Sequence, residues 1–415
     1  MTGGTGDASP LQALSYPLMP TDPGRRAEVL EAPADWRLDP DGFDSRADVV
    51  VWGRMPDPSP SLRSAARTAA AREVTLRTMG RRLPSRLRLV GIHRLAPRRL
   101  QTGGLRGRVR AAVRGGALVE LSGMPAGNRV LDRVLEEAEV GRLEGSFQAG
   151  AGGALLVRVV AADQLPALLR VARAGTPGDP VRGAEALDRL AGTGVPFIPS
   201  VYGRGRTAGA SWIVEQALPG RRPQRVTGRL ARQVALVCRT FPLDDGPPTA
   251  TAADLSGIAA RLPDRADALG RLAAEVARAV EGLPAVVRHG DLWAGNLLVA
   301  RGTLTGVVDW DAWHPAGIPG ADLVQLLGTE SRRRARQALG AAVSCRPWRG
   351  ADLSQAVGAY LDAVGIRSDD DVLELAGIAW WAAEVHGTIT RLPHRAADRA
   401  WLETNVDGVL SALGY

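Results

Sequence analysis

One short segment restricts what this chain can fold into more than any other. It reads VRHGDLWAGNLLV over Val287–Val299, and GVVDWD follows over Gly306–Asp311. The pattern predicts an apolar strand, a tight polar loop and then a hairpin of two strands, 297–300 and 304–308, turning at 301–303. Polar side chains therefore gather at strand ends, where chemistry is usually placed.

Three oxygen-bearing side chains in this segment stand in an order that fits phosphoryl transfer. That chemistry needs a carboxylate that orients the attacking hydroxyl and accepts its proton, and oxygen ligands that hold Mg²⁺ against the phosphates. Asp291, followed by four residues and then Asn296, has the spacing of the base and the metal ligand in a kinase catalytic loop. Asp309, at the end of the next strand, fits the carboxylate that bridges metal and phosphates. Each alone would be an ordinary turn residue, because Asp and Asn favour turns.

The His-Gly-Asp triplet makes the pattern more specific, because it replaces the His-Arg-Asp of protein kinases. Together with Asn296 and the Val-Asp-Trp-Asp sequence after it, the triplet resembles the aminoglycoside phosphotransferase and choline kinase family of small-molecule kinases. The segment 317–323 is also similar to the residues that come after the metal-binding Asp in that family. The resemblance covers residues from roughly 140 to 410 and is strongest between 289 and 322.

This resemblance implies the fold, the cofactors and the roles of the residues. It implies an α+β, protein-kinase-like fold of two lobes, with a small β-rich N-lobe and a larger helical C-lobe. The cofactors would be ATP or GTP with Mg²⁺, and the partner would be a small-molecule hydroxyl acceptor such as an aminoglycoside, a sugar or a choline-like amine. Asp291 and His289 would be the catalytic residues, with His289 bracing the loop, and the metal ligands would be Asn296, Asp309 and Asp311.

The phosphate contacts are expected on two strands near residues 140–147 and 154–160. Gly150 and Gly152 between them form either a nucleotide-covering loop or a plain hairpin turn. The chain contains no lysine, so Arg158 stands where the family has its Lys or Arg. The resemblance makes Glu185 its partner, and the alternative is that Arg158 lies on a solvent-facing edge.

The remaining nucleotide contacts and the acceptor pocket follow only from the order of the elements. The strand ending near Gln216 and Ala217 resembles the hinge, whose backbone would contact the adenine. Four helices are expected near 323–340, 351–364, 370–390 and 395–412, and in similar kinases such helices build the acceptor pocket. Trp380 and Trp381 are considered for that pocket, although tryptophans on a helix are more often core residues. Trp293, Trp310 and Trp313 are closer to the catalytic residues and are the better candidates for shaping the site.

The expected domain organisation has four parts. They are a flexible tail (1–22), an α/β-like region of unknown role (23–125), a kinase-like N-lobe (126–218) and a kinase-like C-lobe (219–415). In the second part, strands are expected near 26–30, 47–52, 87–92 and 117–121, with a helix from Ser59 to about Met79 and a basic helical piece at 105–114.

Composition excludes several other classes of protein. The net charge is +8, but the 52 basic residues are all arginine and are scattered without interleaved aromatics, which argues against nucleic-acid binding. The chain has no apolar run long enough to span a bilayer, and its N-terminus does not resemble a signal peptide, so a cytoplasmic protein is expected. The alternative function is a non-catalytic nucleotide-binding or regulatory module on a kinase-like scaffold.

Overall fold

The structure, a computed structural model, describes eleven stretches of the chain. They are residues 27–31, 49–53, 75–77, 87–88, 119–122, 130–140, 142–149, 154–161, 165–176, 179–367 and 369–415. The chain divides into two compact units, residues 1–181 with 201–217, and residues 182–200 with 218–415. This division places residues 182–200 in the second unit, and the expected division into four parts stays a prediction.

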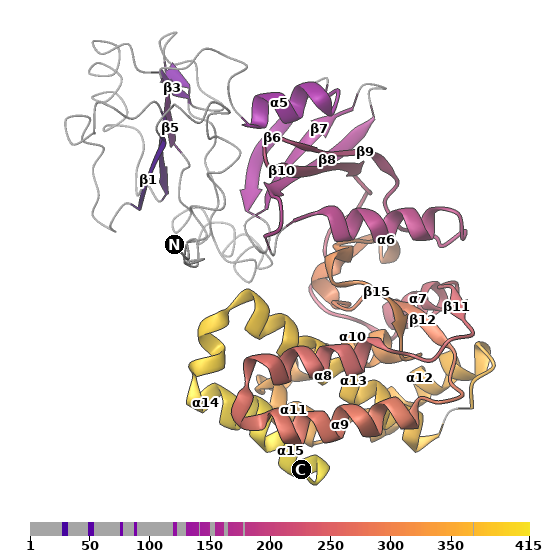
Figure 1. Ribbon diagram of the computed structural model, residues 1–415. Coiled ribbons are helices and arrows are strands. Elements are labelled where there is room, and N and C mark those ends of the chain that lie inside the picture. Colours follow the sequence, from indigo (N-terminus) through magenta and orange to yellow (C-terminus); the bar gives the residue numbers. More distant parts are fainter. Residues whose placement is uncertain are drawn as a thin grey trace. The chain divides into compact units, whose positions relative to one another are not determined.

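The first unit contains two five-stranded sheets, one of them formed by strands near the N-terminus (Figure 1). Its strand order is β1-β2-β5-β3-β4, with bounds β1 Ala27–Glu31, β2 Val49–Gly53, β3 Thr75–Arg77, β4 Leu87–Arg88 and β5 Val119–Ser122. The four strands expected here are confirmed. The expected helix is wrong at its end, because Thr75–Arg77 pairs with β5 as a strand, and long-range pairing overrides local propensity. The rest of that helix and the piece at 105–114 lie outside the described residues.

The other sheet of the first unit is antiparallel throughout. Its order is β6-β7-β8-β10-β9, with bounds β6 Arg142–Ala149, β7 Leu155–Val160, β8 Pro166–Arg173, β10 Ala210–Gln216 and β9 Val201–Thr207. Along β7 the side chains alternate, so that Val157 and Val159 are buried and Arg158 between them is exposed. The helix α5 (Val130–Glu137) packs against this sheet through Val130 and Val134. The sequence did not predict β8.

The second unit is mainly helical. Its helices are α6 Val181–Ala191, α7 Gly228–Cys238, α8 Ala250–Arg261, α9 Ala266–Ala279, α10 Ala321–Ala335, α11 Leu339–Ser344, α12 Ala351–Ala363, α13 Asp370–Arg391, α14 Arg399–Leu402 and α15 Gly408–Leu413. The four expected C-terminal helices are confirmed as α10, α12, α13 and the α14–α15 region. Among the described residues, no helix is long and apolar enough to cross a membrane.

Two short β structures carry the predicted motif within this helical unit. The three-stranded sheet β11-β12-β15 has bounds β11 Leu243–Asp244, β12 Ala285–Arg288 and β15 His314–Gly317. The hairpin has bounds β13 Leu297–Ala300 and β14 Thr303–Val307, as predicted. The loop between β12 and β13 therefore starts from one β structure and ends in another, and both of its ends are fixed.

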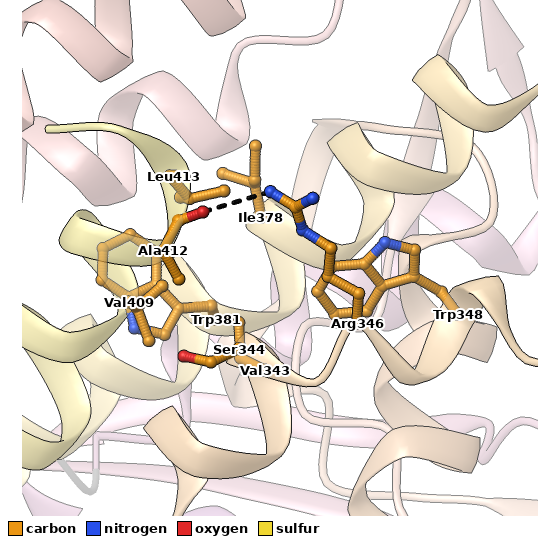
Figure 2. Close-up of a pocket in the computed structure, with 9 residues that line it drawn as sticks. All are labelled: Val343, Ser344, Arg346, Trp348, Ile378, Trp381, Val409, Ala412 and Leu413. Atoms are coloured by element: carbon orange, nitrogen blue, oxygen red, sulfur yellow. Dashed lines mark hydrogen bonds between the residues drawn. The ribbon is translucent and has the colours of Figure 1, made fainter.

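The C-terminal helices enclose a core that includes two of the tryptophans considered for the acceptor pocket. Trp380 and Trp381 on α13 are almost completely buried, and the Trp381 indole N–H donates to the Asn405 carbonyl at 2.8 Å. Trp381 also lines a pocket, drawn in Figure 2, in which Arg346 donates to the carbonyl of Ala412 at 3.2 Å. Its cavity volume is about 10 Å³, enough for about one water molecule. These two tryptophans are therefore core residues.

Candidate active site

The backbone of the loop after β12 is held by two side chains of α10. The carboxylate of Asp322 accepts hydrogen bonds from the N–H groups of His289 and Gly290, at 2.7 and 3.1 Å. Gln325 accepts from the N–H of Leu292 at 3.1 Å and donates to the carbonyl of Gly290 at 3.2 Å. Because both side chains are buried, these bonds form away from water and fix the loop before any ligand arrives.

Gly290 is required at the point where the loop turns. Its φ angle is +77°, in the left-handed region, and a Cβ atom there would lie 2.1 Å from the carbonyl oxygen of Ala312. Any larger residue would push apart the catalytic loop and the segment after Asp309. The glycine of the His-Gly-Asp triplet therefore sets how closely the two chain segments approach.

His289 braces this turn from inside the protein. It is completely buried, its Nδ1 accepts from the N–H of Asp291 at 3.3 Å, and its Nε2 lies 3.1 Å from the carbonyl of Val308. These partners assign the neutral tautomer with the proton on Nε2, which donates to Val308. Burial lowers the pKa of His289, which keeps the ring neutral. Trp310 packs against it, with ring centroids 4.6 Å apart. The imidazole thus positions the loop and is shielded from any substrate.

Asp291 and Asn296 are joined directly. The side-chain N–H₂ of Asn296 donates to the backbone carbonyl of Asp291 at 2.8 Å and to its Oδ2 at 3.0 Å. Burial raises the pKa of Asp291 to about 7; the charges of Asp309 and Glu384 add to this effect, and Arg391 and Asn296 oppose it. A carboxylate of this kind is poised to accept a proton near neutral pH.

The same residues fit a magnesium ion. Because the amide nitrogen of Asn296 is committed to Asp291, its Oδ1 is left buried without a hydrogen-bond partner among the described residues. Asp309 follows β14 with φ +72° and is near enough to Asp291 to raise its pKa. Asp311 is half-buried in the helical turn Trp310–Ala312. Oxygen donors of this type suit Mg²⁺. Among the described residues, these included, no group of three or more His, Cys, Asp or Glu side chains lies close enough together to hold a metal, so a site here would also depend on the Asn296 oxygen.

The structure shows the expected nucleotide-binding residues only in part. Arg158 on β7 and Glu185 on α6 are both exposed, and they belong to different units. The N–H of Ala217 donates to the carbonyl of Pro166 at 3.1 Å, so this hinge donor is already used. Gly150 and Gly152 lie outside the described residues, and Gln216 ends β10. The roles of these residues stay predictions.

Of the aromatic residues near the motif, two remain candidates for shaping the site. Trp310 is only 1% exposed and packs in the core against Phe241 and His289, so it cannot contact a ligand. Trp293 and Trp313 are half-buried, and the guanidinium of Arg333 lies 5.3 Å from the centroid of the Trp293 ring. The prediction for Trp310 is therefore corrected.

Sequence reasoning missed several residues that act on the site. Gln325 lies about one helical turn after Asp322, so both side chains are on the face of α10 that contacts the loop. Glu384 and Arg391 on α13 act on Asp291 through their charges, and only the folded chain brings them close. The acidic run at 369–371 lies at the start of α13, where the carboxylate of Asp369 accepts a hydrogen bond from the N–H of Val372 at 3.0 Å.

A further cluster fixes the strand that leads into the catalytic loop. Arg288, buried at the end of β12, donates to Asp254 of α8 at 2.9 Å, and His386 of α13 lies 2.9 Å from the other oxygen of that carboxylate. Burial alone would raise the pKa of Asp254, but the hydrogen bonds from His386 and Arg288 hold it below its usual value. The ionised carboxylate therefore joins α8, α13 and β12.

The comparison with known proteins decides the family. The model of the phosphotransferase enzyme family matches residues 147–354, half of the chain. The chain belongs to this family. It is a phosphotransferase, a kinase with an alcohol group as acceptor, and its class is the expected α+β class. The matched range contains Asp291, Asn296 and Asp309, so the motif that predicted the family lies within it.

Members of the family with solved structures are distant from this chain. One is the aminoglycoside phosphotransferase APH(3'')-Id from Streptomyces rimosus in complex with ADP and streptomycin, with 20% identity, coverage of 63% of this chain and 99% of that chain, and a TM-score of 0.41. Another is a thermostable mutant of the aminoglycoside phosphotransferase APH(4)-Ia with ADP and hygromycin B, with 13% identity, coverage of 68% and 98%, and a TM-score of 0.44. No curated protein matches the chain.

Proposed function

We propose that this phosphotransferase moves the γ-phosphate of ATP, with Mg²⁺, to a hydroxyl group of a small molecule such as an aminoglycoside, a sugar or a choline-like amine. The observation that carries the proposal is the Asp291–Asn296 pair, in which one amide group orients the base and leaves its own oxygen buried and unbonded. A buried oxygen without a partner calls for an explanation, and a bound cation would supply one.

In this proposal Asp291 acts on the acceptor. Its carboxylate orients the attacking hydroxyl and takes its proton, and a pKa of about 7 before ligands bind suits that task. Glu384 raises this pKa and Arg391 lowers it, so two charged side chains on α13 shift the pKa of Asp291 in opposite directions. His289 and Asp322 keep the loop in place and take no part in proton transfer.

The metal would be held by Asn296 and Asp309, with Asp311 nearby. When bound there, Mg²⁺ neutralises charge on the phosphates and stabilises the transition state. A cation at Asp309 would also lower the pKa of Asp291, because Asp309 raises that pKa by repulsion. Asp291 would then be a carboxylate in the loaded site.

The experiment is a transfer assay with ATP labelled at the γ-phosphate and a panel of aminoglycosides, sugars and amino alcohols. The full chain should label at least one compound, and Asp291→Ala should lower turnover by about 10³-fold or more while ATP binding changes little. The control is Asp267→Asn, at a position in the first turn of α9 outside the motif. ATP binding without transfer to any compound would favour the non-catalytic module, and full turnover by Asp291→Ala would discard the assignment.

A further inference from the structure

The helical unit contains a second, larger hollow that the phosphotransferase site does not use. It lies among α7, α10 and α12, which pack against one another in pairs, and its volume is about 1190 Å³. Pockets for small ligands usually measure about 300–1,000 Å³. None of the residues that line it belongs to the catalytic loop or to the hairpin.

The floor of this groove is apolar. Val226 and Leu323 line it and are buried, and Tyr360 closes it from α12. Leu236 of α7 also lines the groove, and 58% of its surface is exposed. The groove therefore presents apolar surface to solvent without a covering element from the described chain.

The walls of the groove are helix faces with regular spacing. From α7 they include Ala231 and Ala235, and from α10 they include Leu323 and Leu327, each pair four residues apart. This is the surface into which the apolar stripe of another helix packs. Small side chains on α7 allow a close approach of helix axes, which lie about 8–10 Å apart in such contacts.

Free positive charge runs along one wall. Arg225, Arg232 and Arg239 line the groove and are exposed, and no described carboxylate pairs with them. Arg334 on the opposite wall differs, because it is bonded to Glu330 and to the carbonyl of Val226. Arg239, the C-cap residue of α7, follows Arg232 by seven residues, which corresponds to about two helical turns or about 10.5 Å.

We propose that this groove binds an amphipathic α-helix of a partner protein, with its apolar stripe on the floor and its carboxylates facing Arg232 and Arg239. Two acidic residues seven positions apart on such a helix match the spacing of the two arginines, as in the charged flanks of coiled coils. A small anionic amphiphile would use one arginine and would leave much of the length of α7 uncovered.

The docked helix would lie away from the reacting groups. Gln325, which holds the catalytic loop, is on the face of α10 opposite to Leu323, Leu327 and Arg334. Substitutions in the groove can therefore be tested with phosphate transfer as an independent check of folding.

The test uses fluorescence anisotropy with a labelled peptide of about 16 residues, two to three turns longer than needed to span both arginines. The peptide carries Leu at every third and fourth position and Glu at two positions seven apart, and a matched peptide carries Lys in place of Glu. The wild-type chain should bind the Glu peptide saturably with one-to-one stoichiometry, and added salt should weaken the binding. Binding of the Lys peptide should be at least about tenfold weaker.

Two variants and a matched control locate the binding. The double variant Arg232→Glu/Arg239→Glu should weaken binding of the Glu peptide by at least about tenfold, and Ala235→Trp, which fills the groove, should abolish it. Arg261→Glu/Arg278→Glu changes the net charge equally at exposed sites on α8 and α9 and should bind as wild type does.

Three results would overturn the proposal. The first is no saturable binding of the Glu peptide by a wild-type chain that is active in phosphate transfer. The second is undiminished binding by Ala235→Trp. The third is saturable binding of laurate, lost in Ala235→Trp, without binding of the peptide, which would assign the groove to a small anionic amphiphile.

Discussion

The catalytic loop of the helical unit and the sheet of the β-rich unit use opposite means to present polar groups. In the loop, Asp322 and Gln325 bind three backbone N–H groups and one carbonyl, all of them buried. In the sheet, strand pairing satisfies the backbone, and Arg158 extends from β7 to solvent. The loop is thus fixed by specific side chains, whereas the sheet only requires alternating apolar residues. Substituting Asp322 should therefore lower stability, whereas substituting the exposed Arg158 should leave stability nearly unchanged.

The largest effect is expected at Gly290. Gly290→Ala places a Cβ atom 2.1 Å from the carbonyl oxygen of Ala312 at a φ of +77°. We therefore expect the free energy of unfolding to fall by more than about 3 kcal/mol and phosphate transfer to be lost. The matched control is Gly302→Ala, where φ is +78° and a Cβ meets nothing within 4 Å, so the cost should be about 1 kcal/mol. Urea denaturation of both variants measures the difference, and equal losses would show that the close contact is unimportant.

The second effect concerns the two N–H groups bound by Asp322. Asp322→Ala leaves both N–H groups buried and unpaired, which should lower the free energy of unfolding by about 2–4 kcal/mol and lower kcat. Asp322→Asn keeps one acceptor and should fall between wild type and Asp322→Ala. Chemical denaturation and kcat measurements on wild type, Asp322→Asn and Asp322→Ala test this ranking. An Asp322→Ala variant as stable as wild type would contradict the role assigned to Asp322 of α10.

On the sheet, Arg158→Ala should behave differently. Because Arg158 is exposed, the free energy of unfolding should change by less than about 0.5 kcal/mol. If the guanidinium holds phosphates, KM for ATP should rise by about tenfold, and Arg158→Gln should not restore it. Steady-state kinetics at varied ATP concentration decide the matter, with Arg206→Ala on exposed β9 as the control. An unchanged KM would place Arg158 on a solvent-facing edge.

The smallest effect is a dependence of stability on pH. The folded pKa of Asp254 lies below its usual value of 3.8, so this carboxylate stabilises the fold above the unfolded pKa, and the contribution is lost as pH falls through the folded value. Thermal unfolding from pH 6 down to pH 3 should therefore show a shallower loss of stability in Asp254→Asn than in wild type. Asp264→Asn, at a highly exposed carboxylate, should keep the wild-type slope. If stability falls with pH equally steeply in Asp254→Asn and wild type, Asp254 does not contribute to the pH dependence of stability.

The sequence predicted the elements and residues whose function depends on the order of side chains along one segment. The hairpin, the loop and the closeness of Asp291 to Asn296 follow from spacing, because these residues are neighbours in the chain. Contacts from α13 did not follow, since Glu384 is more than 90 residues from Asp291 and nothing local marks it.

Two misassignments have the same physical origin. Trp310 is next to Asp309 in sequence but lies in the core, where it packs against Phe241 and His289. The helix expected to reach Met79 is replaced at Thr75–Arg77 by a strand that a distant segment pairs with. In both cases a partner outside the local pattern determined the structure.

We propose that Asn296 and Asp309 hold a metal-nucleotide beside Asp291, and calorimetric titration with ATP, with and without Mg²⁺, measures this binding. Asp309→Ala should weaken binding of Mg-ATP by about tenfold or more, while Asp291→Ala should leave it within about threefold of wild type. Equal Mg-ATP affinity in wild type and Asp309→Ala would contradict the account.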